Sequence, residues 1–242
     1  MNAIMNVLAK PIGYVLSFLY GLIGNYGIAI IILTLAVKFI LYPLYMKQMS
    51  STARMSAIQP KMKAIQDKYA NDKDMQNQKL AELYKEEKFN PMGGCLPMLI
   101  QMPIIFGLFT LLRNPLYYMG SDERMMFAVH QSFLWMPDLS QPDKWLLPIL
   151  AGIATFISFS MQQQQQPDTG GGQMQSMNGM MKMMKYVFPI MIVMMGRSFP
   201  AGLTIYWSMS QVIQIFFNMR MNKMRERIMA ESAGKKKKGG KK

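Results

Sequence analysis

Apolar residues in this chain of 242 residues gather into five blocks separated by polar segments. The blocks are residues 27–46, 96–112, 145–161, 180–195 and 201–219. A helix rises about 1.5 Å per residue, so roughly 20 residues cross a bilayer core of about 30 Å. The pattern therefore predicts an all-α membrane protein with five transmembrane helices. Blocks of 16 or 17 residues are short for this task, so either the bilayer thins beside them or flanking residues extend them.

Segment 47–90 shows helical periodicity of a different kind. Its apolar residues recur every three or four positions on both sides of the polar turn NDKD at 71–74. The first stripe contains Met55, Ile58, Met62, Ile65 and Tyr69, and the second contains Leu80, Leu83 and Tyr84. The spacing predicts a helical hairpin, with Pro60 opening or kinking its first helix. The hairpin either has a function of its own or acts as a rigid spacer.

The first 26 residues allow two interpretations. They have one basic residue, Lys10, and no A-x-A motif of a cleavage site, so an uncleaved signal-like segment is one interpretation. The other, which we favour, is an amphipathic helix that begins after Pro11 and lies along the outer face of the membrane.

Basic residues then orient the predicted spans. Nine Lys and Arg lie in 47–90 and ten follow Met219, whereas the first 26 residues have one. The positive-inside rule places the hairpin, a flexible Gln-rich loop at 162–179 and a basic tail at 220–242 in the cytosol. The loop at 113–144 and the N-terminus are then external, which agrees with an odd number of spans.

The basic tail ends in AGKKKKGGKK, residues 233–242, which has no apolar face. We expect it to be disordered and to bind either anionic lipid or the phosphates of ribosomal RNA. The lysines concerned are Lys235, Lys236, Lys237, Lys238, Lys241 and Lys242.

Lys38 lies near the middle of the first span, where a charge costs roughly 2.5–3.5 kcal/mol on insertion scales. None of the five blocks contains Asp or Glu, so no carboxylate within a span can pair with it. Its side chain is also too short to reach water from the centre of the bilayer. Two interpretations remain: Lys38 faces a water-filled cavity, or Thr34, Ser158 or backbone carbonyls hold it at a helix interface.

The sequence lacks the residues of an enzyme or of a metal or cofactor site. His130 is the single histidine and Cys95 the single cysteine, so no set of metal ligands or nucleophile with a base is evident. No Gly-rich phosphate loop is present. Function must therefore depend on shape, solvation and binding, and we expect no catalytic residue, cofactor, metal or small-molecule substrate.

Three motifs carry a resemblance to a known family. They are NPMGGCLPMLIQMPIIFGLF at 90–109, ILTLAVKFILYPLYMKQ at 32–48 and FPAGLTIYW at 199–207. With the five blocks, the hairpin and the basic tail, they resemble the YidC/Oxa family of membrane protein insertases, in the short bacterial form without a large external domain.

This resemblance implies a five-helix bundle in the bacterial plasma membrane with a hydrophilic groove open to the cytosol. A positive residue in the groove attracts the hydrophilic segment of a substrate. Lys38 matches that position, although most bacterial relatives have arginine there. Ser158 and Ser160 lie where a glutamine is common, and Trp207 matches an aromatic residue of the groove. Thr34 joins them as a candidate groove residue.

Methionines are abundant, with 29 in the chain, and crowd the last two spans. Flexible thioether side chains suit surfaces that accept many apolar partners. Met191, Met194, Met195 and Met209 could therefore form a slide for substrate helices, although ordinary packing explains any one of them equally well.

The resulting hypothesis is an insertase and chaperone for nascent membrane proteins, working alone or with a Sec-type translocon and binding the ribosome through its tail. The alternative is a small-molecule transporter or channel. The absence of acidic coupling residues in the spans argues against this alternative.

Overall fold

A computed structural model describes residues 2–87, 96–118, 123–165 and 173–239, and every named element in these ranges is a helix. The helices are α1 (Asn2–Ile23), α2 (Tyr26–Ile40), α3 (Tyr42–Lys68), α4 (Lys73–Glu86), α5 (Leu96–Arg113), α6 (Pro115–Tyr118), α7 (Glu123–Ala128), α8 (Leu146–Gln165), α9 (Gln173–Gly196) and α10 (Ala201–Gly239).

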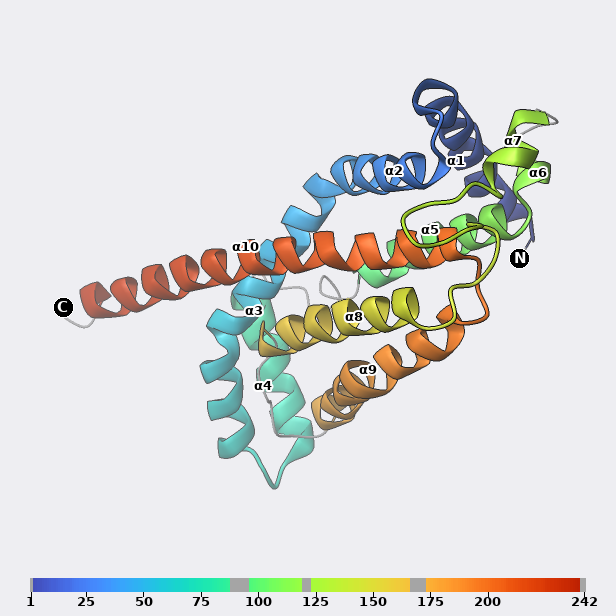
Figure 1. Cartoon of the computed structure of the whole chain (residues 1–242). Coiled ribbons are helices and arrows are strands. Elements are labelled where there is room, and N and C mark those ends of the chain that lie inside the picture. Colours follow the sequence, from blue (N-terminus) through green and yellow to red (C-terminus); the bar gives the residue numbers. More distant parts are fainter. Residues whose placement is uncertain (1, 88–95, 119–122, 166–172, 240–242) are drawn as a thin grey trace.

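The helix α10 runs through the length of the molecule and packs against α2, α3 and α8 (Figure 1). The helix α9 packs on α8, and α1 packs on α2 and α5. The α3–α4 hairpin extends from one end of this bundle. The short helices α6 and α7 and the start of α10 lie at the other end, which we call the loop end (Figure 1).

Close helix packing depends on small residues in α8. A Cβ atom added at Gly152 would lie 2.4 Å from a methyl group of Val193, so only glycine allows α8 and α9 to approach this closely. Gly24 has φ +72°, a conformation that glycine adopts easily, and it separates α1 from α2. Asn25 then caps α2 by accepting a hydrogen bond from the Ile28 backbone N–H.

The first predicted span, 27–46, is not one helix. The helix α2 ends at Ile40, Leu41 separates the two helices, and α3 begins at Tyr42 with Pro43 near its start. Proline lacks a backbone N–H, so it suits the first turn of a new helix and disfavours the continuation of an old one. Residues 42–46 therefore start the first helix of the hairpin.

The hairpin of α3 and α4 has a small core of its own. Ile58, Met62 and Leu83 are buried against one another, and Lys61 forms an ion pair with Glu87. Asp72 caps α4 by accepting a hydrogen bond from the Met75 backbone N–H. Pro60 lies inside α3 and does not open the helix.

The bounds of the first and last helices differ from those that the sequence predicts. The helix α1 begins at Asn2 and contains Pro11, so it does not start after this proline. The helix α10 continues far beyond the predicted end at 219 and includes most of the tail, which we expected to be disordered. Ala, Met, Lys, Arg and Glu dominate this extension, and all of them favour helix. Residues 240–242 lie outside the described ranges.

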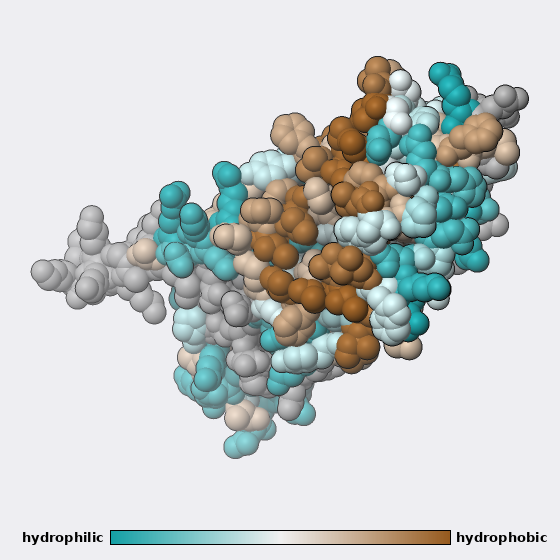
Figure 2. Space-filling model, viewed as in Figure 1, coloured by the Kyte–Doolittle hydropathy of each residue, from teal (hydrophilic) through white to brown (hydrophobic). Residues whose placement is uncertain are grey.

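The surface has an apolar band across the middle of the bundle, with hydrophilic residues at its two ends (Figure 2). In the described residues, one helical segment, Leu146–Gln163 in α8, combines the length and the hydropathy for crossing a membrane. Shorter apolar helical segments are Ala9–Ile23, Tyr26–Ile40 and Met102–Arg113.

Candidate functional site

Lys38 faces the interior of the bundle. Its side chain lies in the last turn of α2 and is only 6% exposed. The Nζ atom lies 3.2 Å from the hydroxyl of Tyr45 on α3 and 5.0 Å from the centre of the Tyr45 ring. A hydrogen bond and a cation–π contact thus solvate the charge in part.

Phe217 of α10 packs against Tyr45 and against its neighbour Tyr42 on α3. The rings of Tyr42 and Tyr45 lie 5.6 Å and 5.5 Å from the ring of Phe217. These contacts hold Tyr45 in place, and Tyr45 in turn holds the lysine. In the part of the chain that the structure describes, the group bonded to Lys38 is therefore a hydroxyl and not a carboxylate.

A second set of polar contacts joins α8 to α10. The Trp207 Nε1–H donates to Thr155 Oγ1 at 2.9 Å, and Asn218 Nδ2 donates to the backbone carbonyl of Ser158 at 3.1 Å. Thr155 and Ser158 are three residues apart, so they share one face of α8. The aromatic Phe188 of α9 lies 5.9 Å from the Trp207 ring.

Several buried polar atoms of α8 and α10 have no hydrogen-bond partner among the residues that the structure describes. They are Ser160 Oγ and Gln163 Oε1 on α8, and Ser210 Oγ on α10. Buried polar groups in native proteins nearly always have a partner in the protein or in ordered water. The helices α8 and α10 therefore carry buried polar atoms that suit water or a polar ligand.

The predicted groove residues thus fall into two groups. Thr34 is buried one turn before Lys38 on α2, but its hydroxyl donates to the Ile30 carbonyl at 2.7 Å and not to the lysine. Ser158 and Trp207 belong to the α8–α10 set, whereas the Ser160 hydroxyl on α8 has no partner among the described residues. The described hydrogen bonds do not link Lys38 directly to Thr34, Ser158 or Trp207.

The proposed slide residues lie mainly on the surface. Met191, Met194 and Met195 are exposed on α9, whereas Met209 is half-buried on α10. The tail lysines Lys235–Lys238 belong to α10, but their side chains lie outside the described part, as do Lys241, Lys242 and Cys95.

Sequence reasoning missed Tyr45, Thr155 and Asn218. Tyr45 follows Lys38 by seven residues, which is two helical turns, so an unbroken helix would have suggested the contact. Asn218 is a polar residue in an apolar block, which is a usable signal. Its partner on α8 lies 60 residues away in sequence, and only the fold brings the two together.

The loop end is organised by two polar side chains of the segment 113–144. Gln131 Oε1 accepts from the Tyr26 backbone N–H at 3.0 Å, and its Nε2 donates to the Tyr20 hydroxyl at 2.9 Å. Asp143 caps α8 by accepting from the backbone N–H groups of Trp145, Leu146 and Leu147. This predicted loop is therefore bonded to α1, α2 and α8.

Comparisons with known proteins agree with this architecture. The family model of the 60Kd inner membrane protein matches residues 18–228. The membrane protein insertase YidC of Fusobacterium nucleatum is 42% identical over 224 residues, which cover 91% of this chain and 98% of that protein. The YidC of Wolinella succinogenes is 39% identical over 94% of this chain, but the match covers only 39% of the longer relative.

A solved structure is also similar. A crystal structure of an active YidC insertase with its first transmembrane domain resolved gives a TM-score of 0.57 at 30% identity, over 87% of this chain and 45% of that one. The family match covers most of the chain, and the Fusobacterium relative has nearly the same length. The chain therefore belongs to the YidC family of membrane protein insertases.

Proposed function

We propose that this protein inserts nascent membrane proteins into the bacterial plasma membrane by moving short hydrophilic segments across the bilayer. Membership of an insertase family, which is not a family of enzymes, supports a role without a catalytic centre. The hydrophobicity of the substrate, with or without the membrane potential, supplies the driving force.

The observation that carries the proposal is the buried lysine without a carboxylate. Lys38 is 6% exposed and bonded to the hydroxyl of Tyr45. The cost of burying a charge falls when water or an opposite charge reaches it. An acidic or polar substrate segment entering beside Tyr45 supplies such a partner and is attracted for this reason.

In our proposal the groove lies between this pair and the α8–α10 set. The unpartnered hydroxyls of Ser160 and Ser210 support a hydrated interior, because such atoms favour water or a polar segment. Thr34, Ser158 and Trp207 line the same path. Exposed Met191, Met194 and Met195 on α9 and half-buried Met209 on α10 offer adaptable apolar side chains to the apolar part of the substrate.

The topology that we propose has five spans, formed by α2 with the start of α3, α5, α8, α9 and the first half of α10. The loop end faces outward, and the hairpin and the end of α10 lie in the cytosol. The surplus of Lys and Arg in 47–90 and after Met219 supports this orientation. The basic end of α10 then meets the ribosome, and a Sec-type translocon is an optional partner.

Reconstitution tests the function directly. Proteoliposomes containing the purified chain receive a single-span test protein with an acidic external segment, and protease protection measures its integration. We expect integration above that of protein-free liposomes and of liposomes with heat-inactivated chain. A correctly folded chain that leaves the test protein outside, or that instead releases a trapped small solute, would contradict the proposal and favour a transporter or channel.

A further inference from the structure

A cavity of about 420 Å³ lies at the loop end, away from Lys38 and the α8–α10 set. Its walls come from the start of α2, the end of α5, the short helices α6 and α7, the loop that follows α7 and the start of α10. Leu112, Met126, Val129 and Leu139 form an apolar part of the wall. The polar part consists of Tyr26, Arg113, Asn114, His130 and Ser140.

Tyr26 marks this cavity as a binding site. Its side chain is only 2% exposed, yet its hydroxyl has no hydrogen-bond partner among the described residues. A buried hydroxyl without a partner costs about 1–3 kcal/mol. A small rotation of the ring toward the cavity would let a polar ligand there remove that cost.

Arg113 supplies positive charge at the cavity wall. It is the last residue of α5 and is exposed, with its guanidinium group 5.7 Å from the centre of the Phe109 ring. Arginine donates several hydrogen bonds in a planar fork, which matches the oxygen atoms of a phosphate group. The neighbouring Asn114 side chain adds an amide that can donate.

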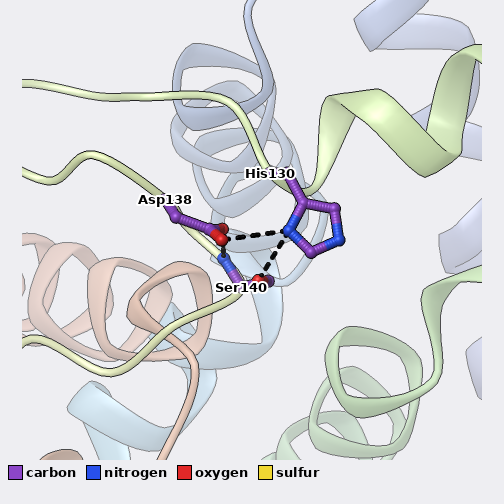
Figure 3. Close-up of polar contacts among 3 residues, drawn as sticks. All are labelled: His130, Asp138 and Ser140. Atoms are coloured by element: carbon purple, nitrogen blue, oxygen red, sulfur yellow. Dashed lines mark hydrogen bonds and ion pairs between the residues drawn. The ribbon is translucent and has the colours of Figure 1, made fainter.

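His130 adds a second nitrogen group, and its partners fix its orientation (Figure 3). The Nδ1 atom lies 3.0 Å from Asp138 Oδ2 and 3.0 Å from Ser140 Oγ. The other ring nitrogen points away from both partners (Figure 3). Arg113 is the one Lys or Arg side chain among the described residues that line the cavity.

Aromatic residues place this cavity at the level of lipid headgroups. Tyr117 at the cavity wall is exposed, and Trp135 and Trp145 are also exposed at the loop end. Tyrosine and tryptophan concentrate at the boundary between the hydrocarbon core and water. A cavity at this level, with one apolar wall and one cationic wall, matches a molecule that has both an anionic head and an apolar body.

We propose that this cavity binds the phosphate group of an anionic glycerophospholipid. Arg113 pairs with the phosphate, the Tyr26 hydroxyl donates to one of its oxygens, and Leu112 and Val129 contact the glycerol and the first acyl carbons. A small phosphate ester has the same phosphate group as the lipid, but it has no acyl chains to contact the apolar wall of the cavity. This inference does not depend on insertion activity, because lipid binding is measured on the purified chain.

Native mass spectrometry of the full chain in detergent tests the proposal. The chain is titrated with phosphatidylglycerol and, separately, with a diacylglycerol that has the same acyl chains and no phosphate. We expect one tightly retained phosphatidylglycerol and no retained diacylglycerol. The Arg113→Gln variant should weaken retention about tenfold or more, and Tyr26→Phe about fivefold, because each removes one donor to the phosphate.

Arg197→Gln is the matched control. Arg197 also lies at the loop end with its guanidinium over an aromatic ring, 4.0 Å from the centre of Trp145, but it does not line the cavity. Its replacement should leave retention unchanged. Equal reductions in the Arg113 and Arg197 variants, or equal retention of diacylglycerol, would overturn the proposal. Displacement by glycerol 3-phosphate at concentrations similar to those of the lipid would show a free phosphate ester as the ligand and overturn the lipid assignment.

Discussion

At the scale of single residues, the pairing of Lys38 with Tyr45 decides how a charge is kept inside the bundle. The hydroxyl at 3.2 Å and the ring at 5.0 Å stabilise the ammonium group without neutralising it. A carboxylate in the same place would neutralise the charge and leave nothing to attract a substrate. The neutral partner therefore fits a residue that acts through its net charge.

The insertion rate of variants at position 38 should depend on the charge of the side chain there. Lys38→Arg should keep insertion, while Lys38→Ala should reduce it about fivefold for substrates with acidic external segments, because charges about 4 Å apart in water attract by ~1 kcal/mol. Lys38→Glu should reduce it further through repulsion. Rates in proteoliposomes measure the effect, and Lys10→Ala, which removes an exposed lysine of α1, is the control. Normal insertion by both Ala and Glu variants would refute an electrostatic role.

The hydrogen bonds that Asp143 accepts predict that the stability of the fold depends on pH. Partial burial raises the pKa of its carboxyl group, but hydrogen bonds from the Trp135 side chain and from the backbone N–H groups of Trp145, Leu147 and Leu146 together lower it below the ordinary value. The folded state thus favours the charged carboxylate. This stabilisation is present above the unfolded pKa of about 3.9 and is lost as the pH falls below it.

The corresponding variant is Asp143→Ala. It should lower the free energy of unfolding by about 1 kcal/mol at pH 7, as expected for removal of a helix cap, and the difference from the unmodified chain should shrink below about pH 4. Thermal unfolding in detergent at several pH values measures this. Asp67→Ala is the control, because Asp67 is exposed on α3 far from α8. A destabilisation that stays constant down to pH 3 would argue against the charged cap.

At the scale of elements, the longest helix, α10, has one half packed inside the bundle and one half that extends beyond it. The first half of α10 packs against α2, α3 and α8, and its second half continues beyond them toward the C-terminus (Figure 1). Apolar packing stabilises the first half, whereas the extension depends on intrinsic helix propensity. The two halves should therefore respond independently to change.

Deleting residues 233–242 tests this independence. The deletion should weaken ribosome binding and make it less dependent on salt. The slope of log affinity against log salt concentration should become shallower by about 0.7–0.9 for each phosphate that the tail no longer neutralises. Thermal unfolding of the bundle should be unchanged. A variant with the six tail lysines replaced by glutamine keeps the length and separates charge from chain length. Unchanged ribosome affinity at low salt would leave lipid as the partner of the tail.

At the scale of the whole molecule, the helices differ in how much of a bilayer they can cover. The 15 residues of α2 reach about 22 Å and the 18 of α5 about 27 Å, against a hydrocarbon core of about 30 Å. The 20 residues of α8 reach about 30 Å, but they end in glutamines. The first span that we propose continues from α2 into the start of α3, so the mismatch is greatest beside α5.

This difference predicts local thinning of the bilayer. Spin labels stepped along 96–112 and 145–161 should show a dry zone shorter than about 30 Å beside α5 and closer to that length beside α8. A label at position 38 should be accessible to a water-soluble quencher. Dry zones of ordinary thickness on both helices, together with a dry position 38, would exclude both the thinning and the hydrated groove.

The sequence by itself determined the all-α class, the five apolar blocks and the isolation of Lys38 from any acid in those blocks. These properties are local, because a run of apolar side chains and the count of charges need no knowledge of distant neighbours. The motifs at 32–48, 90–109 and 199–207 also sufficed to suggest the insertase family, which the comparisons then showed.

Only the tertiary structure decided which groups meet. Tyr45 reaches Lys38 across a break between two helices, Trp207 bonds Thr155 from 52 residues away, and Gln131 bonds the backbone of Tyr26 from 105 residues away. The cavity beside Tyr26 and Arg113 combines residues from positions as far apart in sequence as 26 and 202. Such contacts depend on how helices pack and where they end, because one residue more or less in a helix rotates every later side chain by about 100° toward a different neighbour.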